Sequence, residues 1–267
     1  MLRTLLTPRW LGLLALATVF AVAAVLLGSW QYGRHEERLA HRDLVEAHYG
    51  ADPVPLETVL PPGAALDPAR EWTRVRTTGS YDEAGRLFVR NRPHRGTYGY
   101  QVLGVLRTSA GNLLVDRGWV PNTARAEELP QVDPDPVGTV EVTGWLRPSE
   151  PSLGRDLPEA QLASINVAEA EKELGLDLLD GYLVLESETL PDGSVPSRPE
   201  PAEPPSTELG PHFAYALQWW LTSPVGFVLV WVFARREHRE RTGGDRTAAT
   251  AGTPRPRRTR IWDEEDE

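Results

Sequence analysis

Two long uncharged runs lie near the ends of the chain. Trp10–Trp30 and Phe213–Ala234 contain no Asp, Glu, Lys or Arg and consist mainly of Ala, Leu, Val, Phe and Trp. About 20 helical residues, each rising about 1.5 Å, cross a bilayer core of about 30 Å. The pattern therefore predicts two transmembrane helices, at 10–30 and 213–234. The carbonyl that Pro224 frees is expected to be satisfied by a neighbouring helix or by a Ser or Thr side chain.

The first run has a second interpretation as a cleaved signal peptide. Ala21-Val22-Ala23 has the small residues of a cleavage site. The apolar run continues well past that point, which favours a retained anchor. Small residues also recur along one helical face, at Ala17, Ala21, Ala24 and Gly28. They would let another helix approach closely, although an alanine-rich composition alone would give the same spacing.

Between the two runs, apolar and polar residues alternate with a period near two, and turn residues bound each stretch. Six strands are expected, at 74–81, 86–91, 100–108, 112–120, 139–147 and 181–187. Ser109-Ala110-Gly111 indicates a hairpin. A short helix is predicted at Asn166–Gly175, with Asn166 as N-cap and Gly175 just after its end. The pattern predicts an antiparallel, β-rich α+β domain over 31–188, built as a small barrel or sandwich.

Three flanking segments complete the organisation. Residues 31–50 continue the first span as a charged helix. Residues 189–212 carry seven prolines between Pro191 and Pro211, which is typical of an extended tether. Residues 235–267 mix basic and acidic clusters without apolar periodicity and are expected to be disordered.

The charges predict how the two spans are oriented. Residues 1–9 hold two arginines and no acid, and Arg235, Arg236 and Arg239 follow the second span. By the positive-inside bias, both termini are expected in the cytoplasm, with 31–212 outside the cell membrane. The chain would then be a multi-pass protein of the plasma membrane, a hairpin of two terminal helices flanking an extracytoplasmic domain.

Composition narrows the possible chemistry. The chain has no cysteine, which excludes a disulfide framework, a thiolate metal site and a cysteine nucleophile. His41 and His48 lie two turns apart, which is wrong for a metal site, and they are expected on a solvated face together with His35. None of the usual catalytic signatures occurs, and the arginine content indicates a GC-rich genome rather than a nucleic-acid partner. We therefore expect neither an enzyme, nor a metal site, nor a nucleic-acid-binding protein.

Three short motifs remain. The first is Gly28-Ser29-Trp30-Gln31 with Arg34, directly after the first span. The second joins Asn91-Arg92-Pro93 to Asp116-Arg117-Gly118-Trp119-Val120-Pro121. The third, at the second span, is His212-Phe213 with Tyr215 and Trp219.

In this order between two terminal spans, the motifs resemble the surfeit locus protein family of cytochrome c oxidase assembly factors, over roughly Gly28 to Ala234. The chain departs from the family pattern in its acidic-ended tail and in Gln218. The resemblance implies an assembly factor for a heme-copper oxidase that helps deliver heme a to the core subunit. It makes that core subunit the main partner, a heme a synthase a further candidate, and the lipid bilayer the setting. Two alternatives remain: a scaffold that never touches heme, and an unrelated extracytoplasmic binding module on a membrane hairpin.

His212 is the best candidate for an iron ligand. Heme iron is bound by His, Cys, Met or Tyr, the chain has no Cys, and its one Met is Met1. His212 alone meets the outer edge of a span, and Tyr215 and Trp219 follow on the same helical face. The residues by themselves favour an interfacial anchor or helix cap, and the resemblance adds contact with heme a.

The other motif residues are expected to have structural or partner-binding roles. This set comprises Trp30, Gln31, Arg34, Asn91, Arg92, Asp116, Arg117, Gly118 and Trp119. Asp116 and Arg117 are expected to form an ion pair that braces the turn before Trp119. Arg90, Arg92 and Arg95 form either a solvated rim or a contact for heme propionates or partner carboxylates.

Overall fold

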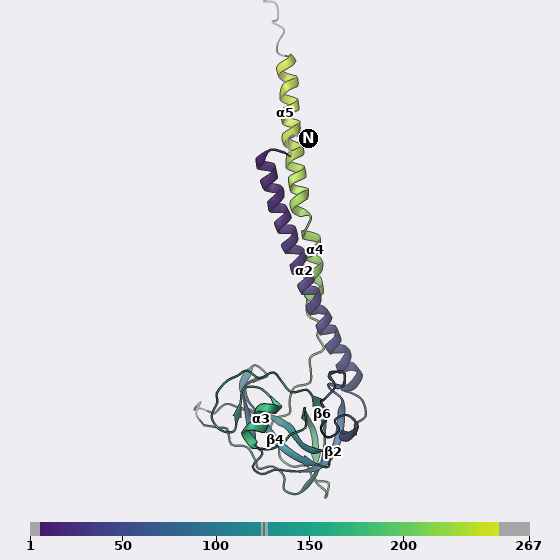
Figure 1. The fold of residues 1–267 in the computed structure, drawn as a ribbon, viewed down its shortest axis with the longest axis vertical. Helices are drawn as coiled ribbons and strands as arrows, with labels where there is room; N and C mark the ends of the chain where they lie inside the picture. Colours follow the sequence, from purple (N-terminus) through teal and green to yellow (C-terminus); the bar gives the residue numbers. More distant parts are fainter. Residues whose placement is uncertain (1–5, 124, 126–127, 251–267) are drawn as a thin grey trace, which may run out of the picture. The chain divides into compact units, whose positions relative to one another are not determined.

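The computed structural model describes residues 6–123, 125 and 128–250. The chain divides into two compact units, coloured along the sequence in Figure 1. The helical unit comprises Met1–Glu37 and Leu209–Glu267, and the barrel unit comprises Arg38–Glu208. Helix α2 (Pro8–His48) contributes to both, because the division falls within it. The charged continuation of the first span is thus confirmed as one unbroken helix.

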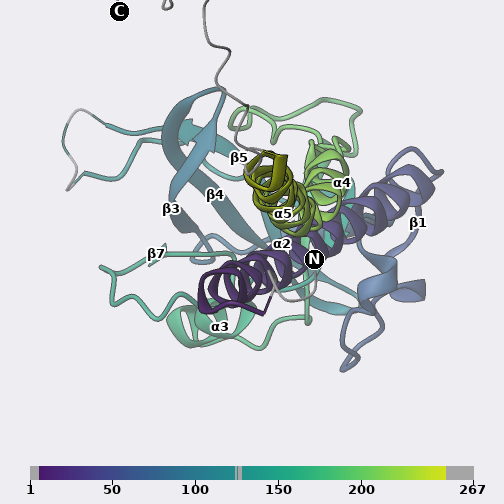
Figure 2. The same cartoon turned by 90° about the horizontal axis from the view of Figure 1, so that it is seen from above.

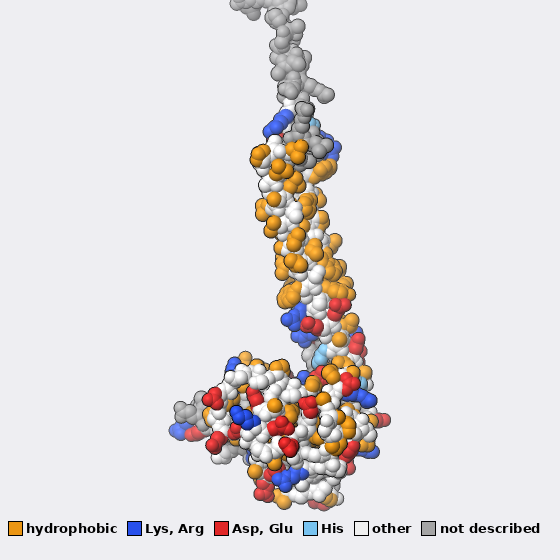
Figure 3. Space-filling model, in the orientation of Figure 1, with side chains coloured by type: hydrophobic (Ala, Val, Ile, Leu, Met, Phe, Trp, Pro, Cys, Tyr) orange, Lys and Arg blue, Asp and Glu red, His pale blue; other side chains and the backbone are white. Residues whose placement is uncertain are grey.

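The helical unit contains the first part of α2 together with α4 (His212–Thr222) and α5 (Val225–Thr250). Both apolar segments are long and apolar enough to cross a membrane. Only 17% of the most apolar stretch of α2 is buried, and 11% of that in the second segment. Figure 3 shows apolar side chains covering these helices. A core helix of a soluble protein would bury most such residues, so the helices are consistent with membrane anchoring.

The small residues of α2 face the second helical segment. Ala17 and Ala24 are buried, and a Cβ built on Gly28 would lie 2.4 Å from the indole ring of Trp220. Only glycine fits beneath this indole, as small residues do where membrane helices approach closely. The prediction that another helix packs on this stripe is confirmed within the helical unit.

Pro224 separates α4 from α5. Proline lacks the N–H that would bond to the carbonyl four residues earlier, which is that of Trp220. The hydroxyl of Ser223 donates to this carbonyl oxygen at 2.8 Å. The prediction that a Ser or Thr side chain satisfies the freed carbonyl is confirmed.

The tail after Ala234 differs from the prediction of disorder. Helix α5 continues to Thr250. Ion pairs at helical spacing stabilise its first turns beyond the apolar run, since Arg236 pairs with Glu240 at 3.0 Å and Arg241 with Glu237 at 2.5 Å. The acidic and basic residues of this segment thus pair along a helix. The prediction of disorder was therefore wrong for residues 235–250. Residues 251–267 lie outside the described part of the chain.

The barrel unit is built on one eight-stranded sheet. Its strands are β1 (Val54–Pro55), β2 (Arg74–Tyr81), β3 (Leu87–His94), β4 (Thr97–Thr108), β5 (Gly111–Pro121), β6 (Thr139–Arg147), β7 (Gln161–Leu162) and β8 (Tyr182–Thr189). The order β2-β6-β8-β5-β4 closes on itself because β2 also pairs with β4. Figure 2 shows β3, β4 and β5 adjacent in this sheet. The barrel alternative is therefore correct, and all six predicted strands are present.

The predicted antiparallel pairing is confirmed for five of the strand pairs described and is wrong for three. β8 pairs with β5 in parallel, as do the short strands β1 with β2 and β7 with β3. Neighbouring strands of a closed ring cannot alternate in direction throughout when their number is odd. A five-stranded barrel must therefore contain a parallel pair, and here that pair is β5–β8.

Two apolar clusters follow from the alternation along the strands. One draws residues from all five barrel strands, including Leu113 and Val115 of β5, and fills the interior. The other includes Leu114 of β5 together with Ala170 of α3 (Val167–Leu174), which covers the outer face. Asn166 caps α3 through its side chain, and Gly175 ends it in the left-handed region, as predicted. Two short 3-10 helices, η1 (Leu56–Thr58) and η2 (Pro68–Arg70), lie in the loop before β2.

The proline-rich segment is not a free tether over its first part. Thr189 belongs to β8, and the barrel unit extends to Glu208. Glu200 pairs with Trp119 of β5 as a strand would, donating its N–H at 3.0 Å and accepting one at 2.7 Å. A non-proline residue inside an extended proline-rich chain keeps both backbone groups for such pairing. The predicted domain boundary at 188 therefore falls too early.

Candidate functional site

His212 begins α4, as predicted, and is half-buried. Its Nδ1 donates to the side-chain oxygen of Gln31 at 2.9 Å. Two motif residues 181 positions apart in sequence thus meet in the helical unit. A proton held on Nδ1 leaves the lone pair on Nε2, the nitrogen that can bind a metal. Metal-binding histidines are commonly oriented by such a second bond.

The tryptophan of α4 that packs on α2 is Trp220, and contact of Tyr215 and Trp219 with heme stays a prediction. Tyr215 is exposed and Trp219 is half-buried. Trp220, one position further, packs over Gly28, and its ring centroid lies 5.7 Å from that of Tyr32. A single step along a helix turns the side chain by about 100°, so the choice between adjacent tryptophans depends on the partner helix.

His35 was expected on a solvated face, which is wrong. Its ring is half-buried, and its centroid lies 5.2 Å from that of Phe213. Its Nδ1 is buried and has no hydrogen-bond partner within the described part of the chain. His35 lies one turn after Gln31 on α2, a spacing that places both on one helical face. The four-residue spacing between Gln31 and His35 is the sequence signal that could have identified His35 as a residue of this site.

Trp30 and Arg34 occupy the neighbouring part of α2. Trp30 is exposed, and the Arg34 guanidinium lies 6.0 Å from its ring centroid. Arg34 also pairs with Glu37 at 2.9 Å. An exposed indole beside a cation is typical of the membrane–water interface.

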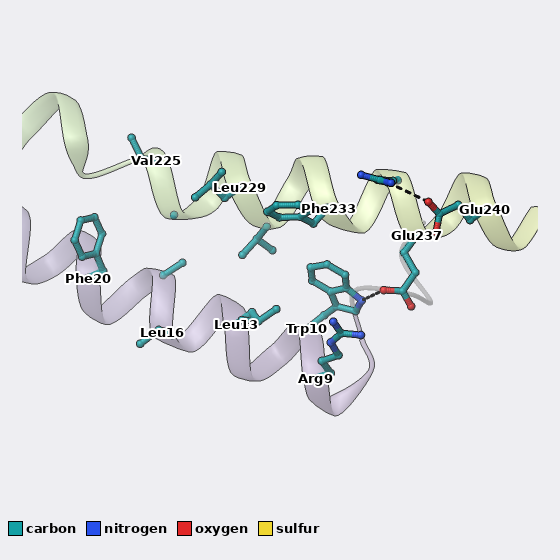
Figure 4. Close-up of a pocket in the computed structure, with 14 residues that line it drawn as sticks. Arg9, Trp10, Leu13, Leu16, Phe20, Val225, Leu229, Phe233, Glu237 and Glu240 are labelled. Atoms are coloured by element: carbon teal, nitrogen blue, oxygen red, sulfur yellow. Dashed lines mark hydrogen bonds and ion pairs between the residues drawn. The ribbon is translucent and has the colours of Figure 1, made fainter.

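A large apolar groove lies between α2 and α5 and has a volume of about 930 Å³ (Figure 4). Leu13, Leu16 and Phe20 line one side, and Leu229 and Phe233 line the other. At its polar end the indole N–H of Trp10 donates to Glu237 at 3.2 Å. Among the residues that the structure describes, its lining contains no His, Met, Tyr or Cys that could bind heme iron.

The second motif lies in the barrel unit, where β3 and β5 flank β4. Asn91 has a φ of 57°, at an irregularity in the β3–β4 pairing. The indole N–H of Trp119 donates to the carbonyl oxygen of Arg92 at 2.9 Å. Trp119 also stacks on His94, with ring centroids 4.9 Å apart. Trp119 thus holds the bulged end of β3, a structural role.

The predicted ion pair between Asp116 and Arg117 does not form. Adjacent strand residues point to opposite faces of a sheet, and these two continue the alternation of Leu114 and Val115. Asp116 accepts from the side-chain amide of Gln101 at 2.7 Å and from the backbone N–H of Gly118 at 3.1 Å. Burial raises the pKa of Asp116 to about 7. The hydrogen bond from the Gly118 N–H and the nearby Arg92 guanidinium act in the opposite direction but are outweighed.

Arg117 lies instead in a buried ionic cluster with Glu188, Asp135 and Tyr81. Its guanidinium pairs with Glu188 at 2.5 Å and also contacts Asp135. The guanidinium lies 4.8 Å from the ring centroid of Tyr81, whose hydroxyl donates to Glu188 at 2.9 Å. Arg117 and Glu188 are almost fully buried. Burial and the neighbouring Glu188 carboxylate raise the pKa of Tyr81 well above its ordinary value.

Gly118 lets the proline-rich segment approach β5. It has a φ of 136°, and a Cβ there would lie 2.5 Å from the carbonyl oxygen of Glu200. The other arginines of the second motif are paired within the barrel unit, Arg92 with Glu150 and Arg95 with Glu200 at 2.5 Å. The Arg95 side chain is 73% exposed and that of Arg92 is 24% exposed, so Arg95 lies at a solvated edge, and contact with heme propionates or partner carboxylates stays a prediction. No group of three His, Cys, Asp or Glu able to hold a metal occurs among the residues described.

Comparison with known proteins agrees with the motif pattern. The family model described as the SURF1 family matches residues 18–223. SURF1-like proteins of Mycobacterium bovis and of two strains of Mycobacterium tuberculosis, all described as uncharacterized, are each 31% identical to the chain over 252 residues. That alignment covers 90% of this chain and 90% of each relative. The chain therefore belongs to the SURF1 family, whose members are known generally as cytochrome oxidase assembly factors rather than as enzymes.

Proposed function

We propose that the protein is a membrane-anchored assembly factor that helps deliver heme a to the core subunit of a heme-copper oxidase. Family membership supports the general role and sets aside the unrelated binding module. The observation that carries the specific role is the bond from His212 Nδ1 to Gln31, which orients the imidazole for a ligand on Nε2. Heme a synthase is the further candidate partner, as the source of the cofactor.

The donor set in this region suits a heme. His212 would bind the iron, and the aromatic side chains of Tyr215 and Trp219 offer apolar surface to the porphyrin. When bound, heme a would supply the redox-active centre of the oxidase, and this protein would only hold and orient it. The groove between α2 and α5 has a suitable volume, but none of the described residues that line it can bind iron, which favours the His212 region.

The proposed topology places His212 at the extracytoplasmic face. Arg235, Arg236 and Arg239 follow the second apolar run, and Arg9 precedes the first. Both termini would then lie in the cytoplasm of a plasma-membrane protein. Reporter fusions at Glu267 and within the loop at Asp192 test this. A periplasmic-type signal from the Glu267 fusion would contradict the hairpin.

Heme content of the purified full-length protein tests the role of His212. Protein is isolated in detergent from cells that synthesise heme a, and bound heme is quantified by the pyridine hemochrome spectrum. We expect His212→Ala to lose most bound heme a. We expect Gln31→Leu to lower the heme content and to shift the absorbance spectrum of the intact protein, recorded before pyridine is added. His41→Ala is the matched control, because His41 lies against Trp72 in the barrel unit, and it should retain wild-type content.

Two results would change the proposal. Wild-type heme content and spectrum in His212→Ala would place the ligand elsewhere, and His35→Ala is then the next variant to measure. Wild-type protein that co-purifies with oxidase subunits but carries no heme a would favour the heme-free scaffold.

A further inference from the structure

A second candidate site lies wholly within the barrel unit. A cavity of about 260 Å³ is bounded by β3, β4, β5, β6 and β8, and the proline-rich segment closes it through Ala202 and Glu203. The segment is held there, because Glu203 accepts the backbone N–H of Arg95 at 3.0 Å and Glu200 pairs with Trp119. Polar and aromatic side chains dominate its walls, on the outer side of the barrel sheet where Asp116 of β5 lies.

Several polar atoms in these walls have no hydrogen-bond partner among the residues described. Trp72 Nε1, Arg92 Nε, His94 Nε2 and Gln101 Oε1 are buried without a hydrogen bond to any residue that the structure describes. The side chains of Trp72 and His94 are only 6% and 5% exposed. His94 Nε2 lies 3.1 Å from a carboxylate oxygen of Glu200, too poorly aligned to form a hydrogen bond.

Such atoms are costly. Each buried donor or acceptor left without a partner destabilises the folded state by about 1–3 kcal/mol. Native proteins rarely gather several of them in one place. Half of the eight unpartnered side-chain atoms found among the described residues line this one cavity. The gathering indicates that something other than protein satisfies them.

Three of these four atoms can donate, whereas Gln101 Oε1 can only accept and would not be satisfied by an anion. The indole N–H of Trp72 and the Nε–H of Arg92 can only donate, so they require an oxygen acceptor. His94 can donate a further hydrogen bond when Nε2 carries its proton. A carboxylate accepts several such bonds, and bonds from a guanidinium to a carboxylate are among the strongest. We propose that this cavity binds the carboxylate group of a small organic molecule.

The charge around the cavity permits an added anion. Arg92 and Arg147 line it and are paired with Glu150 and Glu71, respectively, and Glu203 and Asp116 line it as well. Because burial raises the pKa of Asp116 to about 7, this group is largely neutral in mildly acidic solution and does not repel the anion there. This site does not depend on heme contact at His212.

The carboxylate has two possible sources. The volume accommodates a small free acid, whereas a porphyrin ring is too large and could insert only one propionate arm. Both share the same chemistry at Trp72 and Arg92. The experiment therefore needs a small acid and a porphyrin, each with a form that lacks the charge.

Binding is measured on the full-length protein in detergent at pH 6 by isothermal titration calorimetry, with propionate against propionamide. Metal-free protoporphyrin IX is then compared with its dimethyl ester, as a ligand and as a competitor of propionate. We expect the charged form to bind at least tenfold more tightly than its uncharged counterpart. Saturation by propionate alone identifies a free acid, and binding of the porphyrin diacid alone identifies an arm of a larger ligand.

Trp72→Phe removes the N–H and keeps the ring, so we expect at least fivefold weaker binding of the charged ligand. Trp145→Phe is the matched control, because the Trp145 indole N–H already donates to the carbonyl oxygen of Tyr49 at 2.9 Å. Its affinity should equal that of the wild type. If Trp72→Phe does not fold, the comparison of charged and uncharged ligands on the wild type still decides. Equal binding of both forms, or binding of neither, would mean that water alone satisfies these atoms and would overturn the proposal.

Discussion

Replacing Arg117 by methionine should separate charge pairing from packing in the barrel. Methionine keeps an apolar side chain of similar length but removes the guanidinium from a cluster that is almost fully buried. Asp135 would keep a partner, since Arg86 lies 3.2 Å from it. Glu188 would keep only the Tyr81 hydroxyl at 2.9 Å. The variant therefore leaves one carboxylate buried without a countercharge.

The expected loss is large. Breaking a buried ion pair by removing one partner costs about 3–5 kcal/mol. Removing the second charge as well should restore part of this loss, because replacing a whole buried pair by apolar side chains is often close to neutral. We therefore expect the double variant Arg117→Met, Glu188→Met to be more stable than Arg117→Met alone. An additive account of lost contacts predicts the opposite order.

The free energy of unfolding is measured by urea denaturation of the full-length protein in detergent, followed by near-ultraviolet circular dichroism of the barrel aromatics. Arg107→Met is the control, because the Arg107 side chain is 58% exposed, against 1% for Arg117. Surface pairs contribute about 0–1 kcal/mol. A loss under 1 kcal/mol for Arg117→Met, or a double variant less stable than the single one, would refute this reasoning.

Three further substitutions test other contacts. Asp116→Asn should flatten the pH dependence of the unfolding free energy. Asp116 has a folded pKa near 7 and an unfolded pKa of about 3.9, so the wild type loses stability as pH rises between these values. The same difference in unfolding free energy between pH 5 and pH 8 in the variant and the wild type, measured by urea titration, would contradict this. Gly118→Ala should lower the unfolding free energy by about 2 kcal/mol or more, since the new Cβ meets the Glu200 carbonyl at 2.5 Å, and limited proteolysis should cut the proline-rich segment faster. Gly28→Leu should separate the two helical segments at Trp220, because a Cβ added at Gly28 already lies 2.4 Å from the indole. A chemical crosslink between the two segments that does not use a disulfide should then fail to form. Gly12→Leu should leave this crosslink intact, because no atom lies within 4 Å of a Cβ added there.

Local signals in the sequence predicted the elements well. Strands β2 and β6 begin and end at the predicted residues, and α3 has the N-cap and terminal glycine expected of it. Alternation, caps and turn residues act over a few positions, so one segment carries the whole signal. The same holds for the two apolar runs and for Ser223, which lies beside the proline that it compensates.

Strand pairing and site contacts were less accessible, because they join distant segments. The parallel pairing of β5 with β8 depends on closure of the five-stranded ring, and Glu200 pairs with Trp119 from a segment 81 residues away, so neither can be predicted from one segment. Gln31 and His212 were each identified as motif residues, but their contact was not. The continuation of α5 was missed because ion pairs at helical spacing stabilise it, rather than an apolar stripe.

Asp116 and Arg117 show why a charged dipeptide in a strand is easily misread. Opposite charges next to each other suggest a pair, yet strand geometry sends their side chains to opposite faces. Leu113 and Val115 belong to the interior cluster and Leu114 to the outer one, so continuing the alternation assigns Arg117 to the interior and Asp116 to the other side. The apolar residues of β5 therefore already determined where each charge lies. Each buried charge then required a distant partner: Glu188 for Arg117, and Gln101 for Asp116. The parity of neighbouring apolar residues, rather than the proximity of charges, is the signal that separates the ionic cluster inside the barrel from the polar cavity beside it.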